Sequence, residues 1–158
     1  MKKILVILSL FLVSTLIAFA DNKQEAIDFF NNYVNAANTY STTVASMYSP
    51  DARIIRQVLK PDGTTVDVAT DTATYIKQMK ISQGVAKVRQ YSNSYSNISA
   101  FVIDENTYKV SSLRQPKGET YKLKTYMIVK KQSSGNWLII EEMMQTKEQI
   151  FLKYAKSN

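Results

Sequence analysis

The side chains in this sequence that could do chemistry are carboxylates, tyrosine hydroxyls, lysines and arginines, because the chain contains neither cysteine nor histidine. A Ser-His-Asp triad, a cysteine nucleophile and a histidine acid–base pair are therefore excluded, and so is a zinc site of the usual kind. Any proton transfer has to use Asp, Glu, Lys, Tyr or Arg. We expect no metal and no cofactor.

Two cations are the first candidates for a binding site. Arg56 alternates on one face of a predicted strand with Ala52, Ile54 and Val58, and a lone arginine in such a set is costly to bury unless it is paired. Lys124 faces inward or outward according to a register of one residue. If both cations line a pocket, the pocket favours an anion such as a carboxylate.

Carboxylates and tyrosines are the other candidates. Glu141 and Glu142 are adjacent, so only one can point inward from a strand, where it could act as a base or pair with Arg56. Asp51 follows a proline and is typical of a turn or cap. The ten tyrosines suit either an apolar, hydroxyl-lined pocket or ordinary core packing. The candidate ligand-binding residues are Tyr33, Tyr48, Ile54, Arg56, Tyr91, Lys124, Met127 and Glu142.

Three predicted helices precede or interrupt the strands that must position these residues. Apolar side chains recur every three or four positions over residues 24–40, which predicts an amphipathic helix. Ser41 or Thr42 could cap a second, short helix that Ser49-Pro50 ends. Asp71 is expected to cap a third helix that ends at Gly84.

Strands make up most of the rest. A hairpin is predicted over residues 52–69, with its turn at Pro61-Asp62-Gly63. The segment Thr146 to Gln149 has the form of a capping box and should open a short terminal helix. Further strands are expected near residues 85–95, 97–104, 107–115, 119–131 and 136–145. Helices gathered at one end of an antiparallel sheet make an α+β fold.

Residues 1–20 are predicted to be a secretory signal peptide. Lys2 and Lys3 precede an apolar run, and Ala18-Phe19-Ala20 has the small residues that a signal peptidase accepts. A retained anchor is the alternative, but the run is short for a membrane span. We expect cleavage after Ala20, a periplasmic or secreted protein without a stable membrane anchor, and a single domain over residues 21–158.

The charge pattern does not indicate a nucleic-acid partner. The formal net charge of the whole chain is +7, but the lysines are scattered, and Lys130-Lys131 is one of few close pairs. Scattered lysines are typical of a solvated surface. We therefore expect no binding to nucleic acid.

Two short motifs and the order of elements carry a resemblance to a known family. The motifs are Met47-Tyr48-Ser49-Pro50-Asp51-Ala52, at the entry to the first strand, and Gly135-Asn136-Trp137-Leu138-Ile139, at the entry to the last. The chain resembles the nuclear transport factor 2-like superfamily, which includes ketosteroid isomerase, scytalone dehydratase and the SnoaL-like polyketide cyclases. The resemblance implies a cone-like, curved antiparallel sheet wrapped on N-terminal helices, a pocket inside it and frequent dimerisation through the sheet's outer face.

The isomerase pattern, laid on this chain, lacks its acids. The tyrosine of that pattern falls near Tyr33, its catalytic aspartate at Arg56 and its second acid at Lys124. If this register holds, cations replace both the general base and the protonated acid that would stabilise an enolate. The dehydratase chemistry needs a histidine, which the chain lacks.

Three functions stay open. The preferred hypothesis is an exported, non-enzymatic domain that binds a small amphipathic molecule in a pocket able to favour an anion. The second is an isomerase or hydro-lyase using Tyr33, Asp51 or an inward glutamate. It needs a carboxylate in the cavity, and a desolvated one beside Tyr33 there would overturn the preference for the first. The third is an envelope interaction or dimerisation module, although the polar segment 92–97 disfavours a hydrophobic interface there.

Overall fold

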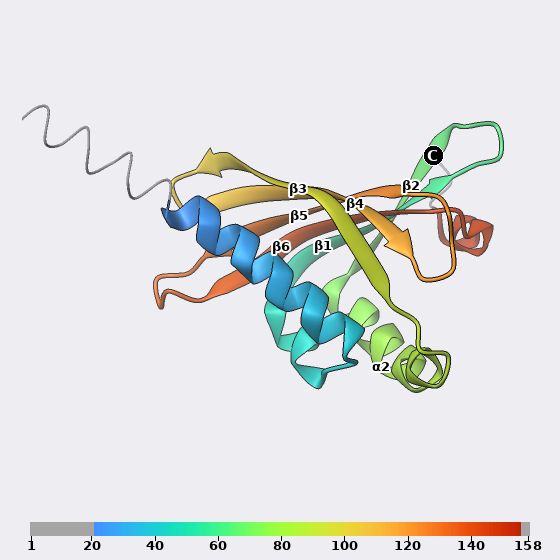
Figure 1. Cartoon of the computed structure of the whole chain (residues 1–158), viewed down its shortest axis with the longest axis horizontal. Helices are drawn as coiled ribbons and strands as arrows, with labels where there is room; N and C mark the ends of the chain where they lie inside the picture. The colour runs from blue at the N-terminus through green and yellow to red at the C-terminus, as the bar shows by residue number, and fades with distance from the viewer. Residues whose placement is uncertain (1–20, 156–158) are drawn as a thin grey trace, which may run out of the picture.

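The computed structural model describes residues 21–155. Its helices cover one side of a curved six-stranded sheet (Figure 1). Residues 21–38 are helical and are followed by a short 3-10 helix, η1 (Thr42–Met47). The remaining elements are β1 (Tyr48–Leu59), β2 (Thr65–Asp71), α2 (Thr72–Val88), β3 (Asn93–Asp104), β4 (Thr107–Pro116), β5 (Leu123–Lys131), β6 (Trp137–Thr146) and the 3-10 helix η2 (Gln149–Tyr154).

The strand order is β2-β1-β6-β5-β4-β3. The neighbours β1 and β6 are parallel and all other pairs are antiparallel, so the sheet is mixed. The predicted α+β class is confirmed, and the one parallel pair arises because the last strand inserts between β1 and β5. This insertion places Glu142 opposite Ile54 on one side and Met127 on the other.

The N-terminal helix lies across the concave face of the sheet (Figure 1). Ala26, Phe30 and Tyr33 are buried there at spacings of four and three, which is the stripe of an amphipathic helix. The rings of Phe30 and Tyr95 are perpendicular, with 5.3 Å between their centroids. The helix predicted over residues 24–40 is confirmed, with the described helix covering residues 21–38, and its buried residues belong to the core.

Helix α2 begins as predicted but ends later. The Asp71 carboxylate accepts a hydrogen bond of 2.8 Å from the Thr74 amide, which caps the helix. The helix continues through Gly84 to Val88, and Gln90, with φ 50°, takes the left-handed conformation after it. The strand predicted over residues 85–95 is wrong up to residue 92, because Gly84 keeps a helical backbone and the left-handed turn comes at Gln90.

The remaining strand predictions hold with changed bounds. The β1–β2 hairpin is confirmed, and Gly63 supplies the positive φ of 85° that its turn needs. The strands predicted at 85–95 and 97–104 are replaced by the single strand β3, which bulges at Asn97. At the terminal helix the capping box is incomplete: Thr146 Oγ1 accepts from the Glu148 amide, and the Gln149 side chain donates to Leu59 and Lys147 carbonyls.

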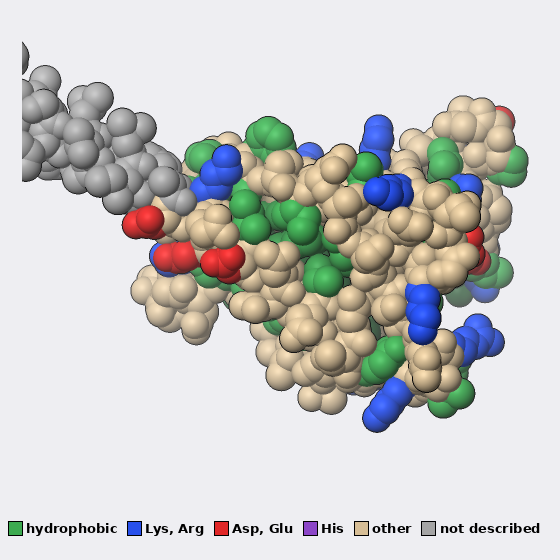
Figure 2. Space-filling view, in the orientation of Figure 1, with side chains coloured by type: hydrophobic (Ala, Val, Ile, Leu, Met, Phe, Trp, Pro, Cys, Tyr) green, Lys and Arg blue, Asp and Glu red, His purple; other side chains and the backbone are tan. Residues whose placement is uncertain are grey.

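Charged side chains are spread over the surface. Figure 2 shows lysines and arginines separated from one another across the visible face, with small apolar areas between them. None of the helices described within residues 21–155 has the length and apolarity needed to cross a bilayer. The predicted signal peptide, residues 1–20, lies outside the described residues.

Candidate functional site

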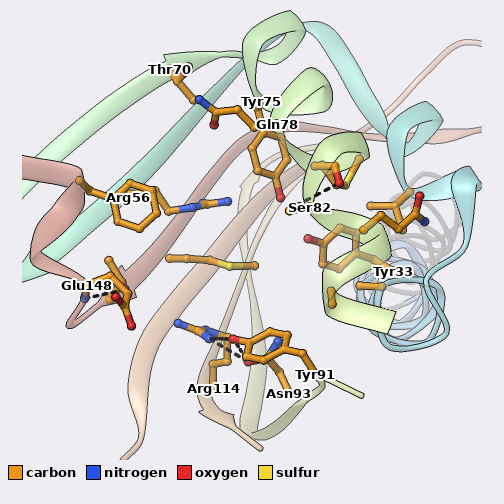
Figure 3. A pocket seen from close by; sticks show the side chains of 18 of the residues that line it. Tyr33, Arg56, Thr70, Tyr75, Gln78, Ser82, Tyr91, Asn93, Arg114 and Glu148 are labelled. Atoms are coloured by element: carbon orange, nitrogen blue, oxygen red, sulfur yellow. Dashed lines mark hydrogen bonds between the residues drawn. The ribbon is translucent and has the colours of Figure 1, made fainter. Parts of the chain in front are cut away.

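A cavity of about 720 Å³ opens between the concave face of the sheet, the end of the N-terminal helix, α2 and η2. Its volume is in the range of small-molecule sites. Most of the side chains that line it are aromatic or aliphatic, including Tyr33, Tyr40, Tyr75, Met79, Met144 and Phe151. Figure 3 shows the labelled side chains of Arg56, Tyr75, Tyr33 and Arg114 arranged around this space. The interior of the cone is therefore open and has two arginines in its wall.

The first arginine, Arg56, is neutralised by a carboxylate. Its Nη1 donates to Glu142 Oε1 at 2.8 Å, and the Glu142 side chain is completely buried. Glu142 Oε2 accepts hydrogen bonds from the hydroxyls of Tyr48 and Tyr33, the latter at 3.2 Å, and the two hydroxyl oxygens are 3.1 Å apart. The Arg56 guanidinium also lies over the Tyr75 ring, 4.9 Å from its centroid. This buried pair thus has the hydrogen bonds that a desolvated charge requires.

The protonation states of Tyr33, Tyr48 and Arg56 favour a role in stabilising the fold over a role in proton transfer. Burial, and then the charge of Glu142, raise the pKa of Tyr33 and of Tyr48 well above the usual value. Burial lowers the pKa of Arg56, but the Glu142 carboxylate raises it more, and the net pKa is above the usual range. The tyrosines stay protonated donors and the arginine stays charged. Both Glu142 oxygens are occupied, and Glu142 does not line the cavity.

The second arginine, Arg114, has only neutral partners. Its Nη1 donates to Asn93 Oδ1 at 2.8 Å and to the Tyr91 hydroxyl at 3.3 Å, and its Nη2 donates to the Gln145 carbonyl at 2.8 Å. The residue is 6% exposed. Among residues 21–155, no carboxylate lies within ion-pair distance of its guanidinium. Arg114 is therefore a buried positive charge in the cavity wall without a counterion from the described chain.

A second layer of neutral hydrogen bonds holds the partners of Arg114. The Asn93 amide donates to Asn38 Oδ1 and the Asn38 Nδ2 donates to the Asn93 carbonyl, both at 2.9 Å. The Tyr40 hydroxyl donates to the Tyr91 carbonyl at 2.8 Å. The end of the N-terminal helix thus positions the start of β3, which in turn orients the guanidinium. These hydrogen bonds orient the Arg114 guanidinium but do not neutralise its charge.

Five of the predicted site residues lie in or directly behind the cavity wall. Tyr33, Arg56 and Tyr91 line the cavity. Tyr48 and Glu142 are buried behind its wall, in the cluster with Arg56. Their role in ligand binding stays a prediction.

Other predicted residues do not reach the cavity. Ile54 and Met127 are completely buried in the core instead of lining it. Lys124 is exposed and belongs to the outer face, so its placement in the pocket is wrong. The physical reason is the register of β5, whose alternate residues Leu123 and Thr125 are buried inward and leave Lys124 outward.

The adjacent glutamates separate as strand geometry requires. Glu142 faces inward, while Glu141 accepts a hydrogen bond of 2.7 Å from the Tyr126 hydroxyl and lies 3.6 Å from Arg53 on the outer face. Asp51 is exposed at the start of β1 and does not line the cavity. The carboxylate that lines the cavity within the described residues is Glu148, and it is exposed.

Sequence reasoning missed Arg114, although a signal for it was present. On β4 the inward residues are Tyr108, Val110, Ser112 and Arg114, so Arg114 shares a largely apolar face as Arg56 does on β1. The same argument from face alternation would have found it. Asn38 and Asn93 carry no such signal, because their roles depend on contacts 55 residues apart in the chain. Among residues 21–155, no cluster of three or more Asp or Glu side chains is placed to hold a metal ion.

Comparisons with known proteins identify the architecture. No protein-family model matches the sequence, and no curated protein matches it significantly. Solved structures with a similar fold include a candidate scytalone dehydratase from Novosphingobium aromaticivorans, with 15% identity, a TM-score of 0.58 and coverage of 84% of this chain and 86% of that one. An NTF-2 like protein of unknown function from Shewanella oneidensis has 12% identity, a TM-score of 0.58 and coverage of 78% and 98%.

Aln2 from a Streptomyces species is also similar, with 11% identity, a TM-score of 0.57 and coverage of 82% of this chain and 93% of that one. At these identities the similarity concerns the fold. It confirms the fold that the motifs and the order of elements indicated. The chain therefore has the nuclear transport factor 2-like fold.

Proposed function

We propose that this chain is a small-molecule-binding domain that holds an amphipathic anion in the cavity without using an acid–base pair there. The observation that carries the proposal is Arg114, a buried cation in a mostly apolar cavity, held by neutral hydrogen bonds and without a carboxylate partner among residues 21–155. A buried charge is expensive unless an opposite charge accompanies it. A bound anion would supply that charge.

The walls indicate the rest of the ligand. Rings from the N-terminal helix, α2 and η2 surround the cavity, among them Tyr33, Tyr75 and Phe151. Such a surface favours an apolar or aromatic body, and the tyrosines can add hydrogen bonds at its edges. An anionic group at Arg114 and an apolar body along these rings make the expected ligand amphipathic.

An anionic, apolar fluorescent probe tests the proposal. Anilinonaphthalene sulfonate should bind the wild-type protein saturably, and Ala86→Trp, which fills the α2 side of the cavity, should remove most of that binding. Ala73→Trp is the matched control, because Ala73 is exposed on the same helix and does not line the cavity. Equal binding by all three proteins, each checked for folding by circular dichroism, would refute a cavity site.

An isomerase or hydro-lyase is the second candidate, and one observation favours it. Such an enzyme would use a desolvated carboxylate beside Tyr33, and Glu142 is completely buried with its Oε2 3.2 Å from the Tyr33 hydroxyl. We rank it second because that carboxylate is paired with Arg56 and shielded from the cavity. Turnover of a β,γ-unsaturated ketone that Tyr33→Phe and Glu142→Gln both abolish would make it the better description.

Export and self-association complete the proposal. Residues 1–20 would direct the chain out of the cytoplasm and be cleaved after Ala20, and N-terminal sequencing of the mature protein tests both points. A homodimer through the sheet's outer face would have to cover polar contacts there. These include the Tyr126–Glu141 hydrogen bond and Lys109 over the Tyr126 ring. Sedimentation at several concentrations would detect such a dimer.

A further inference from the structure

Two buried side-chain polar atoms in the described residues lack a hydrogen-bond partner, and they are neighbours. They are Arg114 Nε and Ser112 Oγ. Both residues are 6% exposed and lie two positions apart on the inward face of β4. Buried polar groups are nearly always hydrogen-bonded. These are two exceptions on one strand face, and one of the two residues, Arg114, lines the cavity.

We infer that Arg114 and Ser112 form the head-group subsite for the carboxylate of an amphipathic monocarboxylic acid. The inference rests on the proposed binding function and adds the class of head group and the residues that select it. The Arg114 side chain supplies the planar, charged donors that match a carboxylate, with Nη1 and one Nη2 bond already committed to Asn93, Tyr91 and Gln145. Of its five N–H groups, the Nε–H and the second Nη2–H remain for the ligand.

The charges around the cavity favour a single negative charge on the ligand. Arg56 is balanced by Glu142 at 2.8 Å, so the uncompensated charge in the buried wall is the one on Arg114. The exposed Glu148, which also lines the cavity, adds a negative charge. A carboxylate balances Arg114 one to one. A dianionic phosphate monoester would bring a second charge for which the described wall has no partner.

Ser112 is suited to the neutral part of the subsite. Its hydroxyl can donate to a carboxylate oxygen. The residue opposite on β5, Thr125, donates its own hydroxyl proton to the Met143 carbonyl at 2.8 Å, so that proton is committed elsewhere. Ser112 is not among the residues that line the cavity, whereas Arg114, two positions along the same face of β4, is. We therefore place the carboxylate at the Arg114 end, with the body of the ligand extending toward the rings of α2.

Three ligands with one aromatic body and different head groups test the subsite. They are naphthylacetate, naphthylethanol and the phosphate monoester of that alcohol, each measured by displacement of anilinonaphthalene sulfonate and by calorimetry. The wild-type protein should bind the acid at least about tenfold more tightly than the alcohol and more tightly than the phosphate ester. Arg114→Gln and Ser112→Ala should each weaken binding of the acid more than binding of the alcohol.

Ser111→Ala is the matched control, because Ser111 is the preceding residue and belongs to the opposite face of β4. Equal affinity for acid and alcohol, tighter binding of the phosphate ester, or unchanged affinity of Ser112→Ala for the acid would each overturn the subsite. If the probe and the alcohol still bind and Ala86→Trp blocks them, the cavity function stands without it. If no ligand binds to the folded wild-type protein, the proposed function itself fails.

Discussion

The two arginines in the cavity wall occupy similar positions and have opposite surroundings. Arg56 on β1 meets a buried carboxylate at 2.8 Å and lies over a tyrosine ring. Arg114 on β4 meets an amide oxygen, a hydroxyl and a backbone carbonyl. In the first arrangement, the charge of the arginine is neutralised by a carboxylate of the protein itself. In the second, the charge of Arg114 can still pair with a bound anion. Burial of an arginine alone therefore does not show whether it stabilises the fold or binds a ligand.

The largest expected effect is at the Arg56 end. Glu142→Gln keeps the shape of the side chain but leaves the Arg56 guanidinium without its counterion. Breaking one partner of a buried pair costs about 3–5 kcal/mol of the free energy of unfolding. Urea denaturation measures the loss. Adding Arg56→Met should restore part of the stability, because the double variant no longer buries an unpaired charge.

A loss of less than about 1 kcal/mol in the unfolding free energy of Glu142→Gln would contradict this contrast between Arg56 and Arg114. It would mean that the pair behaves as a solvated surface ion pair, despite the complete burial of Glu142. The Arg56–Glu142 cluster could then open to the cavity, and the enzymatic alternative would gain support.

At the Arg114 end the same kind of change should affect binding more than folding. Arg114→Gln removes the charge, and no described carboxylate is left unpaired by it. We expect the affinity for the anionic probe to fall by about tenfold or more, since a hydrogen bond to a charged group is worth about 1.5–3 kcal/mol. The loss in unfolding free energy should be smaller than for Glu142→Gln. A larger loss would make Arg114 a structural residue.

Alkaline pH should weaken the Arg56 cluster. The pKa values of Tyr33 and Tyr48 are raised in the folded protein, so the folded state keeps these protons while the unfolded chain loses them above about pH 10. The stabilisation is complete below that pH and is lost as the pH rises. Each tyrosine contributes a slope of up to about 1.4 kcal/mol per pH unit. Tyr33→Phe should reduce the slope of the unfolding free energy against pH, measured by urea denaturation at several pH values. An unchanged slope would show that Tyr33 does not cause this pH dependence.

The smallest effect should come from the support of Arg114. Asn38→Ala removes two hydrogen bonds of 2.9 Å with the backbone of Asn93. We expect a loss of about 1 kcal/mol in stability and a few-fold loss in affinity for the anionic probe, because the guanidinium is less well oriented. Asn35→Ala, an exposed position one turn earlier, is the control. Probe affinity that is the same in both variants would show that Asn38 does not position Arg114.

Local patterns predicted much of the fold. The N-terminal helix, the Asp71 cap, the β1–β2 hairpin and the inward orientation of one of two adjacent glutamates follow from short-range periodicity and capping. Predictions that depended on a single residue were wrong. Gly84 does not end helix α2, and the register of β5 turns the Lys124 side chain outward.

The sequence by itself determined which chemistry is impossible, because without cysteine or histidine no fold could supply it. It also determined which side chains share a face where a strand runs without a bulge, since alternation is a property of the regular extended backbone. Only the tertiary structure decided which arginine receives a carboxylate. That choice joins Arg56 to Glu142 across 86 residues, and it depends on β6 inserting between β1 and β5, which brings Glu142 to β1 and leaves Arg114 on β4 without a carboxylate within ion-pair distance among the described residues.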